Sequence, residues 1–215
     1  MILKALTVIA VVALSNGYLQ WGKKLPPFAS SMYPGAVRER IRIPPRPMPG
    51  FNVLPWLGPW YFYKFNRRPC SWSNSEEYTD FTKVLQLQRN RIITQQTMRT
   101  FGTCKSVTAI WYVNGPGVFK GIDPVGSRYS FTGTIILVDT DYKGFAVIWG
   151  CQKWSVFGNI CEDPGLYITT RHLTPHPEVL RRVESVLLNT WDISLNQLTS
   201  VPHVKPCITG RNPIG

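Results

Sequence analysis

After Gly50 the chain alternates short runs of β-branched and aromatic residues with turn-forming residues. This spacing is typical of an antiparallel barrel or sandwich. Turn sequences such as Asn114-Gly115-Pro116-Gly117 and Asp163-Pro164-Gly165 keep the connections short, which favours neighbouring antiparallel strands in a meander. The pattern predicts eight strands, at residues 60–65, 78–87, 91–99, 105–113, 118–122, 133–139, 145–151 and 166–170.

A helical period appears only near the C-terminus. Val179, Leu180, Val183, Val186 and Leu187 recur at intervals of three and four, after Thr174 or His176 as a cap and a proline in the first turn. The sequence therefore predicts a mainly β fold, an eight-stranded up-and-down antiparallel β-barrel with one C-terminal α-helix packed on its outside.

The N-terminal fifty residues have a different character. A charged start followed by an apolar run too short to span a bilayer indicates a signal peptide at 1–17, with a buried N-terminal element as the alternative. Residues 18–50 are rich in Pro and Arg without periodicity, which favours an extended polyproline-like arm. We expect a secreted, extracellular protein with a barrel domain at 51–207 and a tail at 208–215.

Charge and cysteine content limit the functional classes. The net charge of +12 attracts acidic membranes or polyanions, but the basic residues are scattered and no nucleic-acid motif surrounds them. Five cysteines leave at least one thiol unpaired or shared between molecules, so both a monomer and a dimer stay open. The spacing of cysteines and histidines gives no zinc pattern, and no metal site is expected.

Three segments resemble the lipocalin family, and within it most closely apolipoprotein D and the invertebrate bilin-binding, insecticyanin-like proteins. Gly58-Pro59-Trp60 looks like the family's G-x-W on the first strand, Thr140-Asp141-Tyr142 looks like its T-D-Y turn, and Arg171 matches its basic residue on the last strand. In a closed barrel, Gly58 would let the chain pass under the floor, Trp60 would plug it, and Arg171 would lie across the indole ring.

The resemblance also implies disulfides and a ligand. By position, Cys70 resembles the cysteine that ties the second strand to the C-terminal tail, so the resemblance implies a Cys70–Cys207 disulfide. Cys104, Cys151 and Cys161 remain, and Cys151–Cys161 across the last hairpin is the pair we expect among the three, with the unpaired cysteine left open. Trp149 and Tyr167 match positions near the pocket in relatives. The residues expected to line the cavity are Trp111, Ile135, Leu137, Val147, Trp149 and Tyr167, although some of them can face outward under the helix.

Such a protein would be a carrier of a small hydrophobic molecule, namely a lipid, retinoid, steroid or tetrapyrrole. It would not be an enzyme and would require no cofactor, but a bilin or lipid is among the bound molecules the resemblance implies. One alternative is a surface-interaction protein that uses its basic surface and arm to bind polyanions or membranes. A less favoured one is an enzyme with a thiol in the cavity, because no Cys lies convincingly on an inner face and no catalytic residues show suitable spacing.

Overall fold

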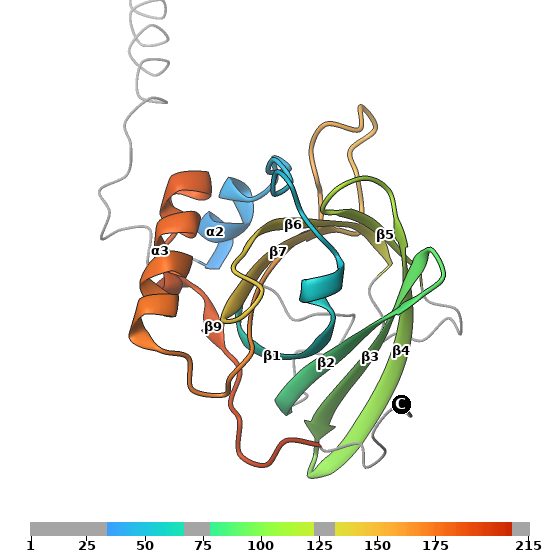
Figure 1. Cartoon of the computed structure of the whole chain (residues 1–215). Helices are drawn as coiled ribbons and strands as arrows, with labels where there is room; N and C mark the ends of the chain where they lie inside the picture. Colours follow the sequence, from blue (N-terminus) through green and yellow to red (C-terminus); the bar gives the residue numbers. More distant parts are fainter. Residues whose placement is uncertain (1–33, 67–77, 123–131, 208–215) are drawn as a thin grey trace, which may run out of the picture. The chain divides into compact units, whose positions relative to one another are not determined.

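The computed structural model describes residues 34–66, 78–122 and 132–207, and the predicted signal peptide and C-terminal tail lie outside these ranges. Eight antiparallel strands form a closed barrel, because β1 (Gly58–Phe65) pairs with both β2 and β8. Each strand otherwise pairs with its neighbour in sequence. Both the predicted barrel and its up-and-down order are confirmed (Figure 1). The other strands are β2 (Tyr78–Gln88), β3 (Arg91–Thr100), β4 (Thr103–Val113), β5 (Val118–Ile122), β6 (Gly133–Thr140), β7 (Phe145–Cys151) and β8 (Pro164–Thr170).

The predicted C-terminal helix is α3 (Pro177–Trp191), which packs on β7. His176 caps it by accepting a hydrogen bond from the backbone N–H of Glu178, and Asp192 ends it in the left-handed conformation. Val183, Leu187 and Trp191 are buried on its inner face. A short 3-10 helix, η3 (Leu195–Gln197), and strand β9 (Thr199–Ser200) follow, and β9 pairs with the end of β1 at Lys64 and Phe65.

Part of the predicted arm is packed against the barrel. Residues 34–40 form helix α2 (Pro34–Arg40), and the side chains of Val37 and Ile41 are buried beside α3. Trp149 donates a hydrogen bond from its indole nitrogen to the carbonyl of Ile41, at 2.7 Å. The prediction of an extended arm is therefore wrong for this part of the chain. Val37 and Ile41 lie four residues apart, and burying them against β7 is more favourable than leaving them exposed.

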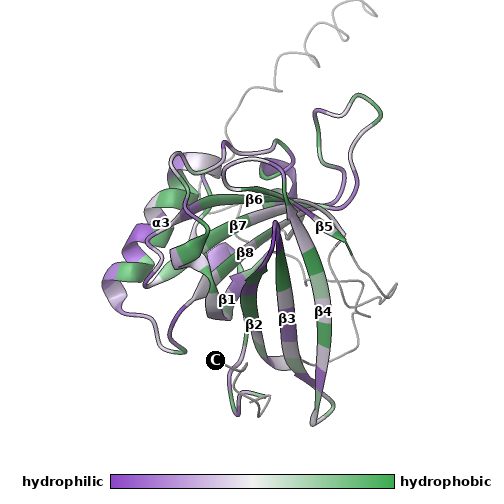
Figure 2. Cartoon of the chain, turned by 45° about the vertical axis from the view of Figure 1, so that its right-hand side comes forward, coloured by the Kyte–Doolittle hydropathy of each residue, from purple (hydrophilic) through white to green (hydrophobic). Residues whose placement is uncertain are grey.

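Two apolar clusters therefore share the wall of β6, β7 and β8. The inner cluster fills the barrel, and the outer cluster joins these strands to α2 and α3. Every residue of β7 and of β8 is buried. Figure 2 shows hydrophobic residues concentrated on these strands and on the face of α3 that meets them.

Candidate functional site

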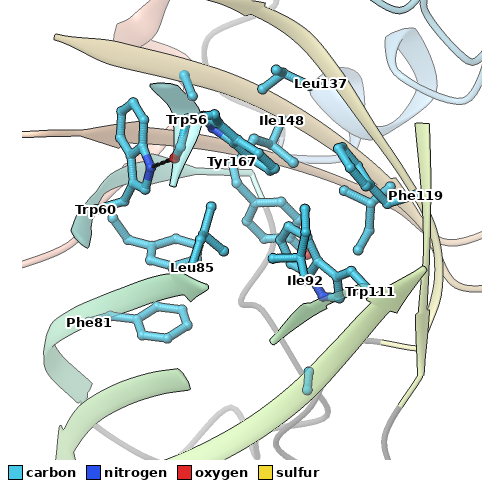
Figure 3. Close-up of a cluster of buried hydrophobic side chains, with 14 of the residues drawn as sticks. Trp56, Trp60, Phe81, Leu85, Ile92, Trp111, Phe119, Leu137, Ile148 and Tyr167 are labelled. Carbon is cyan, nitrogen blue, oxygen red and sulfur yellow. Dashed lines mark hydrogen bonds between the residues drawn. The ribbon is translucent and has the colours of Figure 1, made fainter. Parts of the chain in front are cut away.

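One end of the barrel is closed by a compact group of residues around Trp60. The chain reaches it through the 3-10 helix η2 (Leu54–Trp56), and Trp60 donates from its indole nitrogen to the carbonyl of Trp56 at 2.8 Å (Figure 3). Gly58 adopts a φ of +93°, and a Cβ atom there would lie 3.4 Å from the guanidinium of Arg171. Glycine therefore fits both the conformation and the close approach.

Arg171 stabilises this closed end, which we call the floor of the barrel. Its guanidinium lies 3.8 Å from the centre of the Trp60 ring and donates to four backbone carbonyls, those of Pro55, Leu57, Pro59 and Tyr142. These acceptors belong to η2, its exit, the start of β1 and the turn after β6. One side chain at the end of β8 thus links the continuous stretch from η2 to β1 with the turn after β6 through charge-assisted hydrogen bonds.

The turn between β6 and β7 completes the floor. Asp141 accepts hydrogen bonds from the backbone N–H groups of Lys143, Gly144 and Phe145, and Thr140 accepts one from Tyr142. The Tyr142 hydroxyl in turn accepts from the backbone of Asn52, ahead of η2. The structure therefore brings together the six residues of the closing motif expected from sequence, namely Gly58, Trp60, Thr140, Asp141, Tyr142 and Arg171.

A small cavity of about 30 Å³ lies inside the barrel above this floor. A water molecule needs roughly 10–15 Å³ of such space, so the cavity holds one or two waters and aromatic side chains fill the rest of the interior. Figure 3 shows how Trp56, Trp111, Phe119 and Tyr167 occupy the lumen. The residues that line the cavity are Phe62, Lys83, Gln96, Trp111, Ile135, Ile148, Gly150 and Tyr167.

The structure separates the six expected ligand-binding residues into two groups. Trp111, Ile135 and Tyr167 line the cavity, and Leu137 belongs to the inner cluster without lining it. The expectation is wrong for Val147 and Trp149, which face the outer cluster under α2 and α3. Because β7 is buried on both faces, its sequence shows no alternation from which the inward phase could be deduced.

The cavity contains one charged residue that the sequence analysis missed. Lys83 on β2 is 1% exposed, and its ammonium nitrogen lies 5.3–5.5 Å from the ring centres of Trp56, Phe62 and Trp111. Burial, with a smaller contribution from the charge of Arg171, lowers the pKa of Lys83 to about 7. Lys83 therefore changes its charge near neutral pH.

Two disulfides hold the opposite end of the barrel. The expected Cys70–Cys207 bond is wrong, because Cys207 is bonded to Cys104 at the start of β4; Cys70 itself lies outside the described residues. The second bond, Cys151–Cys161, is the pairing expected from sequence and links the end of β7 to the segment before β8. Cys104 is consequently not a free thiol for cavity chemistry.

Buried Asp80 explains why the tail reaches Cys104. Its carboxylate accepts from the backbone N–H groups of Val204 and Lys205 and from Arg99. Burial alone would raise the pKa of Asp80, but the hydrogen bonds from Thr79, Val204, Arg99 and Lys205 outweigh it and hold the pKa below its ordinary value. Asp80 thereby fixes the tail across β2 and β3, beside the start of β4.

Three arginines of the packed arm make contacts within the molecule. Arg38 donates to the carbonyl of Glu162, Arg40 pairs with Asp192, and Arg42 pairs with Glu39. In the part of the chain that the structure describes, no helix has the length and hydropathy to cross a membrane, and no three acidic, His or Cys residues cluster as metal ligands would.

Solved structures show which class of fold this is. The chain is similar to a cockroach major allergen, Per a 4, with 18% identity and a TM-score of 0.56 over 72% of this chain and 90% of the allergen. It is also similar to lobster apocrustacyanin A1 and to apocrustacyanin C1, each with 14% identity and TM-scores of 0.55 and 0.54, over 72% of this chain and 81% of theirs. The chain has the lipocalin fold.

Two comparisons of the sequence gave no match. No family model matches it, and no curated protein sequence matches it. The structural likeness therefore establishes the fold, while the function follows from the lumen and its residues.

Proposed function

We propose that the protein is an extracellular carrier that holds one small apolar molecule in the barrel lumen. The observation that carries this proposal is the cavity above the Trp60 floor, walled by aromatic and aliphatic side chains and containing two polar residues, Lys83 and Gln96. Apolar walls with a few polar groups are typical of small-molecule sites. The two disulfides, Cys104–Cys207 and Cys151–Cys161, support an oxidising, extracellular location.

The size of the cavity favours a slender ligand. The cavity of about 30 Å³ accommodates only a small group. A larger molecule has to displace the rings of Phe62, Trp111 or Tyr167. A flat tetrapyrrole or a steroid displaces several rings at once, whereas an alkyl chain displaces few. A lipid is therefore favoured over the other expected ligand classes.

Binding of a neutral fluorescent probe, N-phenyl-1-naphthylamine, tests the carrier function. The wild type should bind it, and I135W should bind at least tenfold more weakly because the indole fills the cavity. Y112W is the matched control, since Tyr112 lies next to Trp111 in sequence and is 38% exposed on the other face of β4. Circular dichroism checks that I135W folds, because overpacking costs about 1–3 kcal/mol.

The proposal fails if the wild type binds no apolar probe, or if I135W and Y112W bind equally, which would place the probe on the surface. Native mass spectrometry of protein purified from the organism that produces it would show the mass of the natural ligand. The same measurement under non-reducing conditions distinguishes a monomer from a disulfide-linked dimer, both of which the sequence leaves open.

A further inference from the structure

The polar groups in the cavity are mainly hydrogen-bond donors. Lys83 and Gln96 lie directly opposite each other on β2 and β3, and both side chains line the cavity. Trp111 also lines it, and its indole N–H has no hydrogen-bond partner in the described part of the chain. A buried donor left unpaired costs about 1–3 kcal/mol, so the cavity is set up to receive an acceptor.

Among the residues that the structure describes, no carboxylate is placed against the ammonium of Lys83. The groups around its ammonium are the rings of Trp56, Phe62 and Trp111, and Arg171 is the charged residue that influences it. The remaining cavity residues from β6, β7 and β8 are Ile135, Ile148, Gly150 and Tyr167, of which the phenol of Tyr167 is the one titratable group. No carboxylate lines the cavity among the residues that the structure describes.

We propose that the barrel selects apolar molecules with a carboxylate head, which binds between the ammonium of Lys83 and the indole N–H of Trp111. This inference rests on the proposed carrier function and narrows its ligand to an apolar acid. The head has about the size of the one or two waters that the cavity accommodates. The hydrocarbon chain then runs along Ile148 and Tyr167 toward Gly150, at the end of the barrel opposite Trp60.

Because Lys83 loses its proton near neutral pH, the proposal predicts how the affinity for a carboxylate changes with pH. With a pKa of about 7, Lys83 is mostly ammonium at pH 6 and mostly neutral amine at pH 8, while an alkyl carboxylate is ionised at both. The protonated fraction falls about tenfold over this interval. Affinity for a carboxylate should fall by the same factor, and affinity for an alcohol of equal chain length should stay constant.

Isothermal titration calorimetry of the full-length secreted protein with decanoate and decan-1-ol tests the inference. At pH 6 the wild type should bind decanoate at least tenfold more tightly than decanol. K83M should lose this preference while still binding decanol, W111F should weaken decanoate binding by about threefold to tenfold, and K120M, a substitution of an exposed lysine on β5, should change neither.

Each outcome separates the two proposals. If wild type and K83M bind decanoate and decanol alike, or if the wild-type affinity for decanoate is the same at pH 6 and pH 8, the carboxylate inference is overturned and the carrier function stands. If the protein binds the neutral naphthylamine probe but neither decanoate nor decanol, the inference is likewise overturned. If nothing binds, both are overturned. The wild-type pH profile decides the matter even if K83M does not fold.

Discussion

Lys83 is buried without a neighbouring carboxylate among the described residues, so the free energy of unfolding should depend on pH. The substitution K83M should remove this dependence. In the unfolded chain the lysine has its ordinary pKa of 10.5, whereas in the barrel its pKa is about 7. Between these values the unfolded chain holds a proton that the folded chain has lost, so stability rises with pH. The slope is about 1.4 kcal/mol per pH unit, and below pH 7 the full cost, on the order of 5 kcal/mol, is present.

K83M should therefore be more stable than the wild type at pH 6 by several kcal/mol, because methionine packs among Trp56, Phe62 and Trp111 without a charge. The difference should shrink by roughly 2 kcal/mol between pH 7 and pH 9. Urea unfolding of wild type, K83M and K120M at pH 6, 7, 8 and 9 measures it, and the subtraction cancels the other titrating groups.

K120M should behave as the wild type at every pH, because Lys120 is exposed. A difference between K83M and wild type that stays flat from pH 6 to pH 9 would refute the reasoning. It would mean that the ammonium of Lys83 is hydrated or paired in the folded protein.

Three further substitutions test the two ends of the barrel. G58A should lower the unfolding free energy by about 1–2 kcal/mol in urea denaturation, since φ is +93° and the guanidinium of Arg171 is close; an unchanged midpoint would contradict this. R171K should lower it by about 2–4 kcal/mol, because an ammonium cannot reach four carbonyls and stack on an indole; thermal unfolding that matches the wild type would argue against the floor. The double variant C104S/C207S should lose about 3–5 kcal/mol of unfolding free energy under oxidising conditions, because the bond closes a separation of 103 residues. When both proteins are measured in reductant, the variant should match the wild type. A difference that persists in reductant would mean another cause.

The strand pattern could be predicted because its signals are local. Turn residues such as Asn114 and Gly115 bound the runs, and the stripe that includes Val183 and Leu187 marks the helix. Each signal depends on neighbours in the chain, so no knowledge of the barrel was needed.

The candidate site could be predicted only in part, because its residues depend on which face of a strand points inward. Val147 and Trp149 lie on a strand that is buried on both sides, and the outer cover comes from Ile41, in a segment whose composition indicates an arm. The disulfide of Cys207 was missed for a similar reason: Asp80, far away in sequence, directs the tail toward β4.

The alternation of residues along β2 does indicate that Lys83 points inward. Phe81, Lys83 and Leu85 stand on one face of β2, and both apolar neighbours belong to the inner cluster. A lysine in phase with inward-facing apolar residues is unusual for a structural core, and such departures are expected at functional positions. The strand sequence alone therefore contained the residue that distinguishes this lumen, although not its pKa.

The double covering of β6, β7 and β8 has a consequence for how a ligand reaches the lumen. These strands are clamped between the barrel interior and the layer formed by α2 and α3, whereas β4 has many exposed positions and no helix over it among the described elements. Local opening is easiest where few buried contacts oppose it. Amide hydrogen exchange should be slowest in β7 and β8 and fastest in β4. The structure therefore predicts that a guest larger than the resting cavity enters by local opening at β4 rather than at β7 or β8.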